Sequence, residues 1–348
     1  MKFHVLLALL LSLILSNPAW ALREGLRFEN GGKKAGVHAD GTPKIDDSGF
    51  FAQKLFHDRP QDNTTFQQRY FIDSHYAQGP DSPVFYIICG EWNCAGTSSY
   101  TMVDKLAQQT KAHMVALEHR FYGQSAPFSS LKTENLASLT IEAAIEDLAT
   151  FQRHATKNLN LKGKWISVGG SYAGTLSAFY RLKHPELVSG ALASSAPVLV
   201  KAEFNEYDAH IASVVNRSTC GDRVREAVAL IEKKIATPDG AKQVKALFGA
   251  STITLTEDFL YTVADALAAA VQYGNHQRFC TTILGSGDLI TNYGRAAVAA
   301  LSAIGATAFA ISMQVAEDLN VDPDLNFRQW MCQSCSAFGW FHVPYQPS

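Results

Sequence analysis

The stretch Trp165-Ile166-Ser167-Val168-Gly169-Gly170-Ser171-Tyr172-Ala173-Gly174 decides how this chain folds. Residues 165–168 form a short apolar run typical of a buried strand, and residues 175–184 carry apolar side chains at helical spacing. A serine between a strand and a helix is the layout of a nucleophile elbow, in which a strained turn raises the Ser Oγ above a sheet. Small neighbours are needed there because the strand and helix backbones approach closely. Ser171 is therefore the candidate nucleophile.

The elbow motif departs from the usual one at one position. It reads G-x-S-x-A rather than G-x-S-x-G, so Ala173 has to fit where glycine normally stands, and Gly174 follows one place later. A turn of glycine and serine before a helix is also common in proteins that have no catalytic serine. The order of strand, turn and helix around Ser171 favours the nucleophile over that alternative.

Composition and charge are ordinary for a globular protein. Of the 348 residues, 47% are hydrophobic and 18% are charged. A chain of this length forms one large domain or two. The net charge of −2 provides no electrostatic field that would attract a polyanion, so we expect no nucleic-acid partner.

Residues 1–21 have the pattern of a signal peptide. Lys2 supplies a positive charge, residues 5–15 are largely apolar, and Ala19-Trp20-Ala21 offers an A-x-A cleavage site. The apolar run is short for a bilayer span, which favours cleavage over a retained membrane anchor. We expect a secreted, periplasmic or lysosomal-type location, no stable membrane anchor, and a loosely ordered segment at residues 22–47, where apolar side chains are few.

The cysteine content fits an oxidising compartment. The six cysteines all follow the expected cleavage site and are Cys89, Cys94, Cys220, Cys280, Cys332 and Cys335. An even count in a secreted chain favours disulfides, although about fifteen pairings are open to six cysteines. The spacing Cys332-x-x-Cys335 could instead indicate metal or redox chemistry. No second C-x-x-C and no nearby His pair accompany it, so we expect no metal site.

Strands and helices alternate along the chain up to about residue 201. We expect strands at residues 50–56, 65–73, 84–88, 113–117, 165–168 and 190–197, and helices at residues 102–110, 140–155 and 175–184. The alternation over residues 84–197 predicts an α/β fold, with a mostly parallel sheet covered by helices. We place this core domain at residues 48–201.

Residues 202–348 are expected to form a second, mainly helical domain. Their long alanine-rich segments have helical periodicity and no clear strand up to residue 319. Residues 296–313 carry no charge, which meets the length of a membrane span. They consist largely of Ala, Ser, Thr and Gly, which contribute little transfer free energy, so we expect a buried helix instead.

The chemistry should lie at the carboxyl ends of the parallel strands, where open α/β sheets bind ligands. Acyl transfer at Ser171 needs two backbone donors for the oxyanion. Tyr172 N–H fits the first, and Gly90 N–H or Glu91 N–H fits the second. No metal or organic cofactor is required by such a mechanism.

A polar run, Glu118-His119-Arg120, follows another of the expected strands. His119 could act as a general base. It precedes the serine, however, whereas the elbow architecture places its His after the nucleophile. We therefore interpret Glu118, His119 and Arg120 as a structural polar cluster near the site.

Four motifs are recognisable in order along the chain: Phe66-Gln67-Gln68-Arg69-Tyr70, Glu118-His119-Arg120-Phe121-Tyr122-Gly123-Gln124-Ser125, Gly169-Gly170-Ser171-Tyr172-Ala173-Gly174 and Ala193-Ser194-Ser195-Ala196-Pro197. Together they resemble the prolyl carboxypeptidase family of serine exopeptidases, which includes dipeptidyl peptidase II and thymus-specific serine protease. Gln333-Ser334-Cys335-Ser336-Ala337-Phe338-Gly339 is similar to a later Cys-Phe-Gly segment of that family. The resemblance covers about residues 50–340. It implies an α/β-hydrolase core with an inserted helical domain, Ser171 as the nucleophile, and cleavage of short peptides, often after proline, in secretory or lysosomal-type compartments.

The sequence departs from that family at the triad Asp and His. The family carries them near its C-terminus, in segments similar to Asn-Gly-x-x-Asp-Pro-Trp and Gly-x-x-His, and neither segment is found here. A triad enzyme without its His retains only about 10³–10⁴-fold acceleration over water. Recruitment of His276 or His342 as the base is disfavoured by the chain-order argument.

Two classes of function remain open at this point. The first is a serine exopeptidase in a truncated chain of low or no activity, which includes the first piece of a split enzyme. The second is a non-catalytic homologue that binds peptides or a partner. An esterase on the same fold is a lesser alternative.

Overall fold

The computed structural model describes residues 37–42, 46–99 and 101–339. The expected signal peptide at residues 1–21 lies outside the described residues, as does most of the segment 22–47. The chain divides into two compact units. The sheet unit runs up to Leu199 and includes Leu319–Gln333, and the helical unit comprises Val200–Asp318 and the residues from Ser334. We had expected residues 202–348 to form the helical domain. The structure instead assigns residues 319–333 to the sheet unit.

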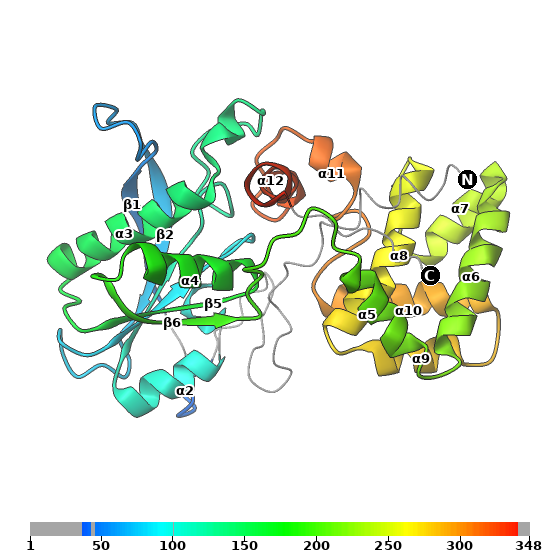
Figure 1. The fold of residues 1–348 in the computed structure, drawn as a ribbon, viewed down its shortest axis with the longest axis horizontal. Helices are drawn as coiled ribbons and strands as arrows, with labels where there is room; N and C mark the ends of the chain where they lie inside the picture. The colour runs from blue at the N-terminus through cyan, green and yellow to red at the C-terminus, as the bar shows by residue number, and fades with distance from the viewer. Residues whose placement is uncertain (1–36, 43–45, 100, 340–348) are drawn as a thin grey trace. The chain divides into compact units, whose positions relative to one another are not determined.

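The sheet unit is built on six strands in the order β1-β2-β4-β3-β5-β6 (Figure 1). They are β1 (Asp47–Lys54), β2 (Thr65–Asp73), β3 (Val84–Ile88), β4 (His113–Leu117), β5 (Trp165–Gly170) and β6 (Val188–Ser194). β1 pairs antiparallel with β2, and β2 antiparallel with β4. The pairs β4–β3, β3–β5 and β5–β6 are parallel. The predicted α/β fold with a mostly parallel sheet is therefore confirmed.

Helices cover both faces of this sheet (Figure 1). α2 (Thr101–Thr110) lies on one face, and α3 (Ile141–Asn158) and α4 (Tyr172–Lys183) lie on the other. All five residues of β3 are buried, as a central strand requires. Successive side chains of β3 point to opposite faces of the sheet. Phe85 and Ile87 pack with Val103 of α2 on one face, and Tyr86 contacts Phe151 of α3 on the other.

Local signals set the helix boundaries. Thr140 caps α3, because its side chain accepts a hydrogen bond from Ala143 N–H at 3.1 Å. α4 starts three residues before the expected helix at 175–184, directly after Ser171. After the helical unit the chain returns as α12 (Phe327–Gln333), and a π-helical turn (Ser334–Phe338) follows it.

The described part of residues 22–47 is held by specific contacts. His38 is 5% exposed, and its Nδ1 lies 3.0 Å from Asp104 Oδ1 of α2. Ala39 N–H donates to Asp104 Oδ2 at 2.6 Å. Asp46 accepts hydrogen bonds from the backbone N–H and the hydroxyl of Thr97. Residues 37–42 therefore adopt a fixed conformation, although few of them are apolar.

The helical unit contains α5 (Glu206–Val215), α6 (Cys220–Ile235), α7 (Pro238–Leu247), α8 (Thr256–Gln272), α9 (His276–Ile283), α10 (Leu289–Ala303) and α11 (Met313–Glu317). The uncharged residues 296–313 do not form one helix, which corrects that expectation. α10 ends at Ala303, and Gly305 follows with φ +66°, a conformation that stops the helix. Among the described residues, no helix has the length and hydropathy needed to cross a bilayer.

Two disulfides account for four of the six cysteines. Cys89 pairs with Cys94 in the sheet unit, and Cys220 at the start of α6 pairs with Cys280 in the middle of α9. Cys332 and Cys335 carry thiols and are not joined to each other by a disulfide. Among the described residues, no cluster of His, Cys, Asp and Glu could hold a metal ion.

Candidate active site

Ser171 occupies the strained turn between β5 and α4. Its backbone has φ 55° and ψ −128°, a conformation that residues other than glycine rarely adopt. Two backbone hydrogen bonds hold it there: Ser171 N–H donates to Ser194 O at 2.9 Å, and Thr175 N–H donates to Ser171 O at 3.0 Å. The structure therefore places Ser171 in the geometry that a nucleophile elbow requires.

The small residues of the motif are required by close backbone packing. A Cβ on Gly169 would lie 2.0 Å from the carbonyl oxygen of Ala173, and one on Gly174 would lie 3.0 Å from Ser194 O. Ala173 is fully buried, and a Cβ on the neighbouring Gly90 would lie 3.4 Å from its methyl group, an ordinary contact distance. The turn therefore accommodates alanine where glycine is usual.

The loop after β3 lies against the first turn of α4. A Cβ built on Gly90 would be 3.6 Å from Ala173 N and 3.8 Å from Tyr172 Cδ1. The backbone of Gly90 and Glu91 is thus brought to the same end of the sheet as Tyr172 N–H. Gly90 N–H and Glu91 N–H therefore stay the candidates for the second oxyanion donor, in a loop that precedes the nucleophile, as the elbow architecture expects.

The phenol of Tyr172 is fixed by a chain of buried hydrogen bonds. His119 Nδ1 lies 2.7 Å from Arg120 O, and because a carbonyl can only accept, this nitrogen carries the ring proton. His119 Nε2 therefore accepts from the Tyr172 hydroxyl, at 2.9 Å. Gln333 Nε2 donates to that hydroxyl at 2.8 Å, and Gln333 Oε1 accepts from the hydroxyl of Tyr122.

Burial keeps this chain of hydrogen bonds uncharged. Desolvation lowers the pKa of His119 to about 4, and desolvation raises the pKa of Tyr172 well above its usual range. Both ring nitrogens of His119 are already engaged and neither contacts Ser171. We therefore keep the interpretation of His119 as part of a structural polar cluster as a proposal. The sequence had not indicated that Gln333 reaches Tyr172, although Gln333 belongs to one of the recognised motifs.

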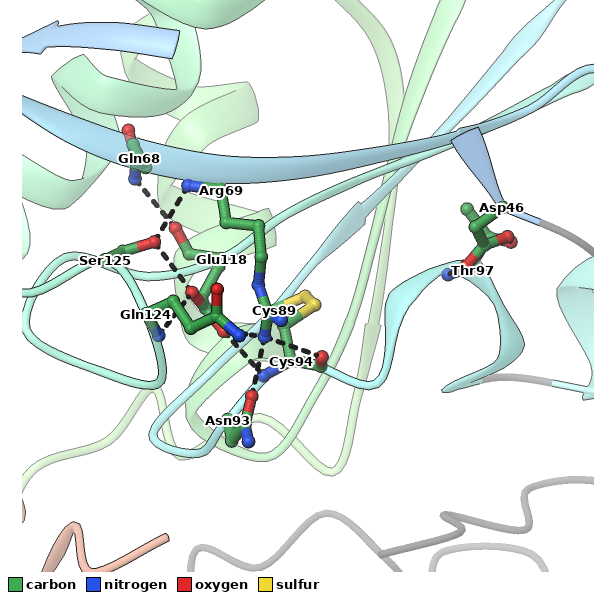
Figure 2. The surroundings of a disulfide bond; sticks show 10 residues. All are labelled: Asp46, Gln68, Arg69, Cys89, Asn93, Cys94, Thr97, Glu118, Gln124 and Ser125. Carbon is green, nitrogen blue, oxygen red and sulfur yellow. Dashed lines mark hydrogen bonds and ion pairs between the residues drawn. A yellow bond between two sulfur atoms is a disulfide. The ribbon is translucent and has the colours of Figure 1, made fainter. Parts of the chain in front are cut away.

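Glu118 and Arg120 lie in separate buried networks at the end of β4. The carboxylate of Glu118 pairs with Arg69 and accepts from the hydroxyl of Ser125 at 2.8 Å (Figure 2). Arg120 binds both carboxylate oxygens of Asp147 in α3, at 2.7 Å and 2.5 Å. Glu118 and Arg120 are fully buried, and each is paired with a side chain of opposite charge.

A base for Ser171 is not found in the described part of the chain. There, no His, Asp or Glu side chain is hydrogen-bonded to Ser171 Oγ. His57 is bonded to Asp147, at 2.7 Å, and His276 begins α9 of the helical unit. His342 lies outside the described residues. The site as described thus has a candidate nucleophile and candidate oxyanion donors.

Comparisons with known proteins agree with this geometry. The model of the serine carboxypeptidase S28 family matches residues 53–347. The chain is 36% identical to "Probable serine protease EDA2" of Arabidopsis thaliana over 308 residues, which cover 84% of this chain and 62% of that protein. It is 30% identical to thymus-specific serine protease of Mus musculus over 333 residues, covering 86% and 65% of the two chains. Lysosomal Pro-X carboxypeptidase of Mus musculus is 38% identical over 161 residues, covering 43% and 32%. The chain spans less than two thirds of the length of each of these relatives.

Proposed function

The chain belongs to the serine carboxypeptidase S28 family, and from that premise we propose that it is a secreted or lysosomal-type serine exopeptidase that hydrolyses short peptides after proline. The observation that supports this most is the strained backbone of Ser171 at the junction of β5 and α4. The name of the Pro-X carboxypeptidase relative supports the preference for proline, and the signal-peptide pattern of residues 1–21 supports secretion.

In the proposed reaction, Ser171 Oγ attacks the scissile carbonyl and forms an acyl-enzyme. The developing oxyanion accepts hydrogen bonds from Tyr172 N–H and from Gly90 N–H or Glu91 N–H. Water then attacks the ester and releases the second product. The proton of Ser171 has to pass to a base and on to the leaving amine.

The rate of that reaction depends on the base that takes this proton. An oxyanion hole and substrate binding alone supply about 10³–10⁴-fold over water in a triad enzyme. With no base in contact with Ser171 in the described residues, we propose that this chain by itself turns over slowly. No metal or organic cofactor enters the proposed steps.

Labelling with a fluorophosphonate tests the nucleophile. The full chain is expected to be labelled at Ser171, and Ser171→Ala is expected to abolish the label. Ser189→Ala, which removes an exposed serine of β6, is the matched control and is expected to label like the wild type. Hydrolysis of proline-containing dipeptide amides, measured against short acyl esters, separates a peptidase from an esterase.

A second candidate function is favoured by one observation, the lack of a base bonded to Ser171 among the described residues. On this alternative the protein binds peptides without cleaving them. A chain that is folded by circular dichroism, binds proline-containing peptides, and leaves Ser171 unmodified would support it and would reject the peptidase.

A further inference from the structure

The loop from Cys89 to Cys94 carries the second candidate oxyanion donor. It leaves β3 at the carboxyl edge of the sheet, and its first residues pack against the first turn of α4. The disulfide joins its two ends, so that Gly90 and Glu91 lie inside a small covalent ring. Both cysteines are 7% exposed and belong to the hydrophobic core under α2. The disulfide end of the ring is therefore fixed in the hydrophobic core.

Glu118 holds the far end of the ring (Figure 2). Its Oε1 accepts from Cys94 N–H at 3.0 Å and from Arg69 Nη2 at 2.5 Å. Its Oε2 accepts from Gln124 N–H at 2.9 Å and from the hydroxyl of Ser125. The four donors satisfy this fully buried carboxylate. Gly123 is part of the arrangement, because a Cβ there would lie 2.0 Å from Glu118 Oε1.

The side chain of Asn93 links the ring to two other segments of the sheet unit. Its Oδ1 accepts from Arg69 Nη2 at 2.6 Å, and its Nδ2 donates to Asp324 Oδ1 at 3.3 Å. Arg69 Nη2 is also 3.3 Å from the carbonyl oxygen of Cys94. β2, β4 and the segment before α12 thus all contribute side chains that hold one short loop.

Resting on the proposed function, we propose that the Cys89–Cys94 disulfide and the Glu118–Arg69 pair are positioning elements. They fix the amide N–H of Gly90 and Glu91 where the oxyanion of the transition state forms. An oxyanion hole acts through preorganised donors, so a loop that can move loses part of the rate even when the protein stays folded.

The proposal makes the site sensitive to reduction. A dithiol reductant supplies two electrons and two protons, breaks the Cys89–Cys94 bond into two thiols, and becomes a cyclic disulfide itself. The loop then keeps its Glu118 and Asn93 contacts but loses its covalent closure. Reoxidation restores the ring, so the loss of rate is reversible.

The test compares the two disulfides of the chain. Cys89→Ser/Cys94→Ser is expected to lower the fluorophosphonate labelling rate and kcat by about 10- to 100-fold with KM little changed, less than the 10²–10³-fold cost of deleting a donor outright. Cys220→Ser/Cys280→Ser, in the helical unit, is the control and is expected to lower the unfolding temperature while leaving the rate constants within about twofold at about 15 °C. Reductant is expected to slow this control variant to the level of Cys89→Ser/Cys94→Ser.

The outcomes separate the two proposals. A wild type that is not labelled at Ser171 overturns the peptidase, and this inference with it. Normal labelling of the wild type and of Cys89→Ser/Cys94→Ser overturns the positioning role alone, as does a rise in KM without a change in kcat. Should the double variant fail to fold, Asn93→Ala loosens the same loop from outside the core. A fall in kcat there supports the proposal, and an unchanged kcat contradicts it.

Discussion

Asp265 makes the stability of the helical unit depend on pH. It lies in α8, is 0% exposed, and neither carboxylate oxygen has a hydrogen-bond partner in the described structure. Desolvation raises its pKa from 3.8 to about 8. The folded protein therefore keeps Asp265 protonated in acidic and neutral solution, whereas the unfolded chain releases that proton above about pH 4.

The sign and size of the effect follow from this difference. Because the native state binds more protons, its stability is full below pH 3.8 and falls as the pH rises towards 8. The slope is about 1.4 kcal/mol per pH unit, so the free energy of unfolding drops by about 3 kcal/mol between pH 5 and pH 7. Asp265→Asn has no proton to lose. Its stability relative to the wild type should therefore rise by that amount over the same interval.

Thermal unfolding of both proteins at pH 5, 6 and 7, followed by circular dichroism, measures this. The difference in unfolding temperature is expected to grow by about 10 °C from pH 5 to pH 7. Only the change with pH is diagnostic, because the buried amide that the substitution introduces adds a constant cost of its own. Asp239→Asn, which removes an exposed carboxylate of α7, controls for the loss of one charge. Parallel curves for the wild type and Asp265→Asn would refute the argument.

Three further predictions concern the elbow and its hydrogen bonds. Gly169→Ala should abolish soluble folded protein because its Cβ would meet Ala173 O at 2.0 Å, whereas Gly190→Ala, with no atom within 4 Å, should change the urea midpoint little. Tyr172→Phe should cost about 1–3 kcal/mol in urea unfolding, since it leaves His119 Nε2 and Gln333 Nε2 buried without a partner, and a cost under about 0.5 kcal/mol would contradict the network. The imidazole of His119 should stay neutral from pH 8 to pH 5 in an NMR titration. Because the pKa of His119 is lowered to about 4 in the folded protein, the unfolded chain binds the proton first, and the free energy of unfolding should decrease as the pH falls below about 6.5. An NMR titration midpoint of His119 near 6.5 in the folded protein would show that its imidazole is not buried as described.

The parts of the fold that follow local patterns could be predicted from the sequence. β3 and β4 match the expected strands at 84–88 and 113–117, because continuous apolar runs of that length suit strands covered on both faces. The elbow was recognisable because its small residues have to be adjacent in sequence to let β5 and α4 approach. The cap at Thr140 is equally local.

Features that depend on distant residues could not be predicted in this way. Gln333 bonds to Tyr172, and residues 319–333 join the sheet unit only after the whole helical unit has been passed. The uncharged stretch at 296–313 was expected to be one helix because hydropathy alone does not show where a helix ends, whereas α10 stops at Ala303 before Gly305. The pairing of Cys220 with Cys280 likewise needs α6 and α9 to be packed together, which spacing along the chain does not show.

The described residues contain the candidate nucleophile and the loop with the candidate oxyanion donors, and no base for Ser171 is seen among them. Ser171 is strained within the sheet unit, and the loop that carries Gly90 is anchored at Cys94 by Glu118, which follows β4. None of these contacts depends on a base. On the proposed function, oxyanion stabilisation uses this loop and proton transfer uses a separate group, so we expect the two to fail independently. A variant that removes the Cys89–Cys94 disulfide should lower the rate by the same factor at every pH, because it removes no group that takes the proton of Ser171.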